Sequence, residues 1–339
     1  MKRILTIVVP TYNAEKYLED NLKSFCIPEI LDDIQVLVIN DGSTDGSLKI
    51  AEKYAKRYPE VYKVISKQNG GHGSGINCGI KHAEGKYFKV VDADDWIARE
   101  AFVKLVRFLK QSDSDIVYSG FYWVFDKGQA KLEDFEKEIE IVEPFSGVIY
   151  GKEYRFDDIA DRSYIKMHNM TIKTNILQDN NIYIDEHCYY VDTEYITYPI
   201  PFAHTISCID EFVYMYRIGS SGQSVSLAKM REHEKNYDKV MESLLKYHDQ
   251  LGKTIECSEA KKKYISRIIA RVVAGKMKIM LSFPASKEKK EQMISYDRLL
   301  LTEYPDIYSS NINKAIKLLR KTNYLFYNAA HVMVCRKYQ

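Results

Sequence analysis

The sequence contains no CxxC pair, and its six cysteines are scattered along the chain. Close cysteine pairs are typical of zinc sites and redox motifs, and disulfide frameworks belong to oxidising compartments. We therefore expect no zinc site and no disulfide framework, and predict a reduced, cytoplasmic protein. No stretch reaches the roughly 18 apolar residues of a membrane-spanning helix. The first apolar run ends at Pro10 without the cleavage pattern of a signal peptide.

Two glycine-rich nucleotide-binding motifs are also missing. The segment that follows the first apolar run, Pro10–Asn13, has neither glycine nor lysine. A dinucleotide-binding domain requires GxGxxG at this place, and a P-loop NTPase requires GxxxxGK followed by Ser or Thr. Both classes are therefore excluded. The same absence argues against a nucleotidyltransferase, since such enzymes usually bind a triphosphate with a glycine-rich basic loop there.

Charge is nearly balanced over the whole chain but not along it. The formal net charge is +2, yet residues 229–339 hold 23 Lys and Arg against 12 Asp and Glu, a net charge of +11. Residues 1–228 therefore carry a net charge of −9. This asymmetry predicts two units with different surroundings, and a chain of 339 residues is long enough for two domains.

Apolar runs rich in β-branched residues alternate with amphipathic segments over the first 118 residues. This alternation predicts βαβ units and a parallel sheet with right-handed crossovers. The expected strands are Ile4–Val9, Ile34–Ile39, Tyr62–Ser66, Tyr87–Val91 and Asp115–Tyr118. The expected helices are Ala14–Phe25, Asp45–Tyr58, a segment from the glycine turn at Gly70 to Lys81, and Ala98–Lys110.

Polar residues follow the ends of these strands, and ligands of parallel sheets bind at that edge. An aromatic ring, carboxylates, amides and a lysine suit a nucleotide. The residues are Thr11, Tyr12, Asn13, Asp41, Lys67, Asn69, Asp92, Asp94 and Asp95.

The most pronounced of these groups is the acidic turn Asp92-Ala93-Asp94-Asp95, which follows a buried strand. Three carboxylates within four residues require a cation to share the site, and a divalent ion with oxygen ligands fits best. The alternative is a helix cap, because acids favour the N-terminus of the helix expected from Ala98.

The second half of the chain is less regular. Residues 120–165 appear strand-poor and acidic, which suggests an insertion that covers the sheet edge. A short strand is expected at Ile182–Asp185, a helix from Asp192 to about Pro199, and strands within Ile206–Arg217, followed by a small polar loop at 218–226. Helical periodicity dominates beyond Ala228, with helices expected at Met230–Leu251, Ser258–Phe283, Ser286–Tyr304, Asn311–Arg320 and Tyr324–Arg336.

Four segments, in this order and spacing, resemble family 2 glycosyltransferases with the GT-A fold. They are VVPTYNAEKYL, VLVINDGSTDGS, NGGHGSGINCGIKHAEGKYFKVVDADD and, more weakly, YVDTEYITYPI. The resemblance implies a Rossmann-like α/β domain at 1–228, with a nucleotide-sugar half to about residue 118 and an acceptor half at 119–228. A basic α-helical domain at 229–339 follows.

The resemblance also implies a reaction: transfer of a sugar from a UDP-sugar with inversion, assisted by Mn²⁺ or Mg²⁺. The acceptor would be a glycan, a lipid-linked glycan or a glycoprotein, in surface polysaccharide or glycoprotein glycan synthesis. A non-catalytic nucleotide-sugar-binding or assembly protein with the same fold, and a nucleotidyltransferase, are the alternatives.

The family's site residues carry over onto matching positions. Tyr12 would lie against uracil, Asp41 would accept from its imide, and Asp92-Ala93-Asp94 corresponds to the DxD signature, with Asp94 as the metal ligand and Asp92 toward the ribose or the metal's water shell. Asp95 would be a second ligand or a helix cap. The remaining nucleotide-sugar positions are Pro10, Thr11, Asn13, Lys67, Asn69, Gly73 and Asn77.

Two further positions are implied with alternatives attached. Asp192 matches the general base, but Val191 stands where the family often has an acid, so a helix cap is the alternative and Glu194 is the reserve base. Arg217 would pair with the diphosphate near a lid containing Gly222–Ser224, or would form an ordinary salt bridge.

Histidines and the basic domain complete the list. His72 lies in the glycine turn and either contacts the donor or is solvated, whereas His168 and His187 lack metal-ligand spacing and are not expected to bind metal. The basic helices have no nucleic-acid motif. Three alternatives stay open for them: peripheral contact with the inner face of a membrane, self-association, or a plain solvated bundle.

Overall fold

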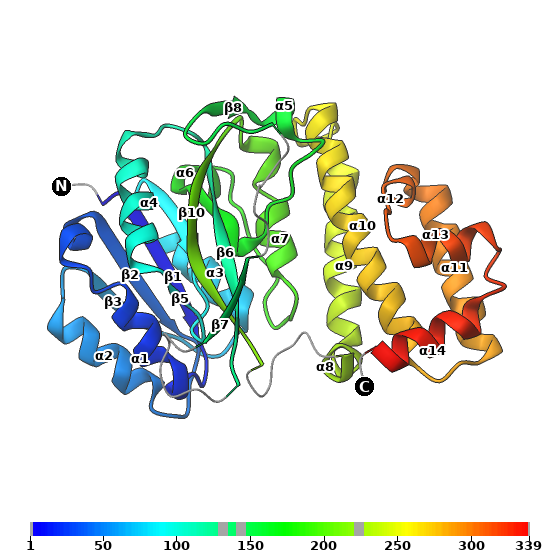
Figure 1. Ribbon diagram of the computed structural model, residues 1–339, viewed down its shortest axis with the longest axis horizontal. Helices are drawn as coiled ribbons and strands as arrows, with labels where there is room; N and C mark the ends of the chain where they lie inside the picture. The colour runs from blue at the N-terminus through cyan, green and yellow to red at the C-terminus, as the bar shows by residue number, and fades with distance from the viewer. Residues whose placement is uncertain (1–2, 128–134, 140–146, 220–226, 338–339) are drawn as a thin grey trace. The chain divides into compact units, whose positions relative to one another are not determined.

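The computed structural model describes residues 3–127, 135–139, 147–219 and 227–337. The chain divides into two compact units, Met1–Ser221 and Gly222–Gln339. This division lies close to the expected boundary after residue 228. Figure 1 shows a sheet flanked by helices in the first unit and helices alone in the second.

Four parallel strands form the first half of the sheet, in the order β3-β2-β1-β4. Every residue of β1, β2 and β4 is buried, as in parallel sheets covered by helices, whereas β3 at the end of the sheet is only partly buried. The bounds are β1 Leu5–Thr11, β2 Ile34–Asn40, β3 Tyr62–Ser66 and β4 Tyr87–Val90. The parallel sheet expected from the sequence is confirmed.

Helices cover both faces of this half (Figure 1). Leu5, Ile7 and Val9 point to the face covered by α1 Glu15–Ser24, α2 Ser47–Arg57 and α4 Arg99–Gln111, because alternate strand residues share a face. Val8 points to the other face, where α3 His72–His82 packs. A 3₁₀ turn, η1 Pro28–Asp33, leads into β2.

The second half of the sheet is mixed, and within the described residues ten strands join one sheet. The path continues from β4 as β9-β6-β10-β5, while β7 pairs with β6 and β8 with β10. The bounds are β5 Trp96–Ile97, β6 Ile116–Phe125, β7 Glu136–Ile139, β8 Glu153–Arg155, β9 Met170–Lys173 and β10 Thr205–Ile218. Short helices connect them: α5 Phe156–Ile159, η3 Met167–Asn169, α6 Thr174–Asp179, α7 Asp192–Thr197 and η4 Ile200–Phe202.

Two expectations for this half were wrong. Ile182–Asp185 is not a strand: its backbone bonds to side chains instead, with Ile184 held by Asn77 and Asp185 by Glu194. The region after residue 120 is less strand-poor than expected, because β6 continues to Phe125 and pairs with β7. Within the expected insertion at 120–165, residues 128–134 and 140–146 lie outside the described residues.

The second unit contains helices at the expected places, but the first expected helix divides into α8 and α9 at His233, and an additional short helix, α12, begins at Pro305. Ser258, Ser286 and Asn313 accept hydrogen bonds from the first turns of α10, α11 and α13. The bounds are α8 Leu227–Glu232, α9 Glu234–Gln250, α10 Glu259–Ser282, α11 Lys287–Glu303, α12 Pro305–Ser309, α13 Lys314–Lys321 and α14 Tyr327–Lys337. Over the described part of the chain, no helix combines the length and apolarity that crossing a bilayer requires.

Candidate active site

The acidic turn after β4 brings three carboxylates together, but each has a different environment. Asp95 is buried and fully engaged: Tyr214 donates its hydroxyl hydrogen bond to Oδ2 at 2.5 Å, and the backbone N–H of Arg217 donates to Oδ1 at 2.7 Å. Burial and the neighbouring Asp94 and Asp92 raise the pKa of Asp95 well above its usual value. Asp95 therefore ties the turn to β10.

Asp92 pairs with a histidine from α3. His72 Nε2 lies 2.8 Å from Asp92 Oδ1, and both side chains are partly exposed. Burial disfavours the charged form of each, yet the interaction between them outweighs it. As a result the pKa of His72 is raised and the pKa of Asp92 is lowered. The pairing with Asp92 therefore favours the charged form of His72 beside the acidic turn.

Asp94 is the carboxylate left available. Within the part of the chain that the structure describes, no side chain donates a hydrogen bond to it, and it is half-buried. Burial, and then the charge of Asp92, raise the pKa of Asp94 to about 6. An unpaired carboxylate beside a second carboxylate is well suited to a hard divalent cation.

Ligand atoms of Asp92, Asp95 and His168 also lie within 4.8 Å of one another. His168 Nδ1 is buried without a hydrogen-bond partner, and burial lowers the pKa of His168 to about 3, so the ring is neutral and able to coordinate. Both oxygens of Asp95 are already engaged, however, as described above. The residues therefore fit a divalent ion near this turn, with Asp94 and Asp92 as the better carboxylates.

Asp192, the expected base, begins α7 on the same side of the site. Its side chain is exposed to solvent, yet surrounding protein atoms and the charge of Asp92 raise its pKa, against the opposing effect of His72. The same electrostatic contacts link His72 to Asp92, Asp94 and Asp192. Glu194, the reserve candidate, is fully buried and accepts from the backbone N–H of Asp185 at 2.8 Å.

Asp41, at the end of β2, is held by the turn that precedes α3. It is buried, and its carboxylate accepts from the backbone N–H groups of Gly70 and Gly71 and from Lys67 Nζ at 2.8 Å. The Asn69 amide donates to the backbone oxygen of Asp41. These three expected residues, Asp41, Lys67 and Asn69, therefore form one connected group.

The residues at and after the end of β1 include one exposed aromatic ring, and the others make contacts within the protein. Tyr12 is 55% exposed, so its ring is free to stack on a ligand. Thr11 is buried, and Pro10 packs against Gly75 of α3. Asn13 accepts a hydrogen bond from the backbone of Thr44, which joins the loops after β1 and β2.

Two α3 residues that were expected to surround the nucleotide-sugar, Asn77 and Gly73, make contacts within the protein. Asn77 donates to the Ile184 carbonyl at 2.8 Å and accepts from the Ile184 N–H at 2.9 Å. A Cβ at Gly73 would lie 2.2 Å from the Asp185 carbonyl oxygen, so glycine permits this segment to cross α3. Both residues thereby position the chain that leads to Asp192; their roles toward a donor stay predictions.

Arg217 forms the ordinary salt bridge that was its alternative. Its guanidinium lies 3.1 Å from Asp126, and its Nε donates to the Asp94 carbonyl at 2.8 Å. The group lies over the rings of Tyr17 and Trp96, and the residue is only 3% exposed. Arg217 therefore holds the acidic turn through the backbone carbonyl of Asp94. The lid residues Gly222–Ser224 lie outside the described residues.

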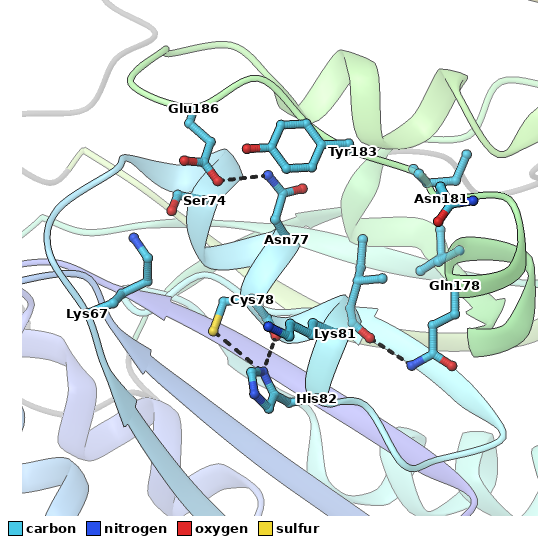
Figure 2. Close-up of a pocket in the computed structure, with 13 residues that line it drawn as sticks. Lys67, Ser74, Asn77, Cys78, Lys81, His82, Gln178, Asn181, Tyr183 and Glu186 are labelled. Carbon is cyan, nitrogen blue, oxygen red and sulfur yellow. Dashed lines mark hydrogen bonds between the residues drawn. The ribbon is translucent and has the colours of Figure 1, made fainter.

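A pocket of about 690 Å³ lies on the flank of α3 (Figure 2). Of the expected nucleotide-sugar residues, Lys67 and Asn77 line it, while the acidic turn does not. Figure 2 shows Asn77 directed at Glu186, and Cys78 and Lys81 on the same helix flank. The pocket thus borders the Asp41 group but is separate from the acidic turn.

Sequence reasoning missed how His168 and Tyr214 enter the site. His168 lies on the short turn η3, where its ring packs against Tyr214 and Tyr216 at centroid distances of 4.8 and 4.3 Å. Neither residue belongs to a recognisable motif. His72 was recognised from its place in the glycine turn at the ligand edge, and the structure places it against Asp92.

Comparisons with known proteins agree with this architecture. The family model described as Glycosyl transferase family 2 matches residues 6–185. The uncharacterized glycosyltransferase EpsJ of Bacillus subtilis (strain 168) is 29% identical over 301 residues, covering 87% of this chain and 84% of EpsJ. The poly(ribitol-phosphate) beta-N-acetylglucosaminyltransferase TarS of Staphylococcus aureus (strain MW2) is 28% identical over 227 residues, covering 66% of this chain but only 37% of TarS.

Solved structures show the same fold. A crystal structure of S. aureus TarS 1-349 in complex with UDP-GlcNAc has a TM-score of 0.66 at 21% identity, and covers 98% of this chain and 89% of that chain. The mannosyltransferase PcManGT from Pyrobaculum calidifontis, in complex with GDP-Man and Mn2+, has a TM-score of 0.53 at 13% identity, and covers 99% of this chain and 87% of that chain. The expected GT-A fold is confirmed.

Proposed function

The chain belongs to glycosyl transferase family 2 and is a glycosyltransferase, and from this premise we propose that it transfers a sugar from a UDP-sugar to an acceptor hydroxyl with inversion. A divalent ion, Mn²⁺ or Mg²⁺, would assist at the diphosphate. The acceptor would be a growing surface polysaccharide or a glycoprotein glycan at the cytoplasmic face of a membrane. The family match gives no support to the nucleotidyltransferase alternative.

The observation that carries the proposal is the free carboxylate of Asp94 beside the His72–Asp92 pair. Asp94 and Asp92 would hold the cation, which neutralises the charge that develops on the leaving diphosphate. TarS with UDP-GlcNAc and PcManGT with GDP-Man and Mn2+ are similar folds that bind a nucleotide-sugar, and in PcManGT a metal as well. Exposed Tyr12 and the Asp41 group lie at the ends of β1 and β2, where a uridine would be recognised.

Inversion requires one base on the face opposite the leaving group. Asp192 would take the proton of the acceptor hydroxyl while that oxygen forms a bond to the anomeric carbon. The bond from this carbon to the diphosphate oxygen breaks at the same time, and UDP leaves with the electron pair. The exposed position of Asp192 supports this role, because a base must reach the acceptor hydroxyl, and its raised pKa makes the carboxylate a stronger base.

A UDP-release screen tests the reaction. The full chain is incubated with Mn²⁺ and each of a panel of UDP-sugars, and slow donor hydrolysis identifies the donor without knowledge of the acceptor. Asp94→Ala should lower the rate by roughly a thousandfold or more, since it removes the main metal ligand. Asp113→Ala, which removes an acid whose side chain is 81% exposed, is the matched control and should retain activity.

Calorimetry with UDP and Mn²⁺ distinguishes a non-catalytic protein. Metal-dependent UDP binding that is lost in Asp94→Ala supports the proposal. UDP release at the same rate in Asp94→Ala, or binding of UDP that ignores the metal, would contradict it.

A further inference from the structure

Large exposed apolar side chains are concentrated in the second unit. Among the described residues, eight of the twelve lie between positions 299 and 333, and single exposed apolar residues elsewhere need no explanation. The most exposed are Leu325 at 74% and Met333 at 71%. Such a concentration indicates a surface that meets something other than water.

The chain beyond Asp306 carries basic residues and no acidic ones. Residues 307–339 contain six Lys and Arg and no Asp or Glu. One of the six, Arg320, makes its contacts within the unit. It donates hydrogen bonds to buried Asp297 and lies over the ring of Tyr308. The exposed lysines of α13 have no ion-pair partner among the described residues. Their charge is therefore available to an outside partner.

Helix α13 presents charge and apolar surface together. Its inner side buries Ile316 and Leu319. Its outer side exposes Lys314, Lys317, Leu318 and Lys321, which share one face because they follow the spacing i, i+3, i+4, i+7.

The turn directly after α13 also exposes apolar side chains. It adds Leu325 and Phe326, exposed by 74% and 48%. We name these six residues the basic–apolar face: Lys314, Lys317, Leu318, Lys321, Leu325 and Phe326.

Helix α14 repeats the arrangement. His331 Nδ1 donates to the Leu281 carbonyl at 2.8 Å, which attaches one side of the helix to α10. The other side exposes Val332, Met333 and Arg336, again one helical face. Two consecutive helices thus expose apolar residues flanked by cations.

We infer that the basic–apolar face docks the protein on an anionic lipid surface. Apolar side chains of this size insert between headgroups, and lysines extend their charge to anionic phosphates while their stems stay in apolar surroundings. Each lysine near such a surface strengthens binding by about fivefold. The inference does not depend on the sugar-transfer reaction.

A second copy of the chain is the less suitable occupant. A symmetric dimer brings the same patch of both subunits together. Here that would place Lys314, Lys317 and Lys321 of one copy against the same lysines of the other, with no acid between 307 and 339 to compensate. An anionic membrane offers the opposite charge over the whole face.

Vesicle flotation with the full chain tests the inference. The vesicles contain phosphatidylglycerol with phosphatidylcholine, or phosphatidylcholine alone. The protein should float with the anionic vesicles, lose this binding at high salt, and fail to bind the neutral vesicles. The triple variant K314Q/K317Q/K321Q should bind the anionic vesicles on the order of 100-fold more weakly. The double variant L325S/F326S should bind them roughly tenfold more weakly.

A matched control separates the face from total charge. K235Q/K253Q/K263Q removes three exposed lysines of the same unit that are not flanked by exposed apolar residues, and should bind as the unchanged protein does. An equal loss in this control would overturn the inference, because binding would then follow net charge alone. Unchanged flotation of L325S/F326S, together with a change from dimer to monomer in sedimentation, would assign the face to self-association instead.

Discussion

Asp192 is the residue that should separate turnover from binding. Its carboxylate is exposed at the start of α7, while the neighbouring Glu194 is fully buried. Asp192→Asn keeps the shape and hydrogen-bonding reach but cannot accept a proton. We expect sugar transfer to fall about 10²- to 10⁴-fold while UDP affinity, measured by calorimetry, stays unchanged. Retained turnover would remove Asp192 from the role of base.

Lys89 offers a prediction about pH. This β4 residue is fully buried, its Nζ donates to the carbonyls of His168 and Met170, and burial lowers its pKa to about 7. The unfolded chain has a lysine pKa of about 10.4. Between these values the unfolded state binds more protons than the folded state, so the contribution of Lys89 to stability rises as pH increases from 7 to about 10.

Lys89→Met tests this effect. The free energy of unfolding, measured in urea at several pH values, should increase from pH 7 toward pH 10 by more in the unchanged protein than in the variant. Comparison of the two removes the effects of other titrating groups. An identical pH dependence in both proteins would show that Lys89 is not the responsible group.

At the scale of elements, α3 determines how the ligand edge is built. Its residues hold Asp92 through His72 and Ile184 through Asn77. It lies close to β1, since a Cβ at Gly79 would come within 2.5 Å of the Val8 side chain. Sequence periodicity predicted the helix, but glycine at this contact is what sets its distance from the sheet.

Gly79→Ala should therefore lower stability. Alanine gains about 1 kcal/mol in helix propensity, but overpacking against Val8 costs typically about 1–3 kcal/mol. The loss should be the larger effect, because Val8 is fully buried in a strand paired on both sides. Urea unfolding measures the difference, and Cys78→Ala on the half-exposed side of the same helix is the control. A stabilised Gly79→Ala variant would mean that the helix can move outward freely.

For the whole molecule, the two compact units should respond differently to ligand. All expected nucleotide-sugar and metal residues lie within Met1–Ser221. UDP with Mn²⁺, at 100 times its Kd, should stabilise the unit that binds it by about 2.7 kcal/mol. Hydrogen exchange should show new protection at the ends of β1, β2 and β4 and none in α9–α14. Protection that extends into the second unit would contradict this separation.

The charge division follows the same two units. The acidic first unit contains the carboxylates of the proposed reaction, and the basic second unit contains the basic–apolar face. Composition alone therefore predicted two units with different surroundings. Composition did not distinguish docking on a membrane from self-association, because the same excess of lysines is compatible with both.

The sequence alone was sufficient to predict the parallel half of the sheet, the polar ligand edge and the helices of the second unit. These features depend on periodicity and on residues close together in the chain, which local physics controls. The resemblance to family 2 also predicted Asp94 as the main ligand of a cation, and this assignment stays a prediction. The sequence predicted a strand at Ile182–Asp185 that does not exist, because side chains of Asn77 and Glu194 take the backbone bonds that a neighbouring strand would have made.

Only the tertiary structure decided which carboxylates of the acidic turn have a side-chain partner. Tyr214 reaches Asp95 across 119 residues, and His72 reaches Asp92 across 20, which leaves Asp94 without a side-chain partner in the described chain. The exposure of Leu325 and Met333 was decided in the same way. Such pairings and exposures depend on how distant segments pack, and no local pattern encodes them.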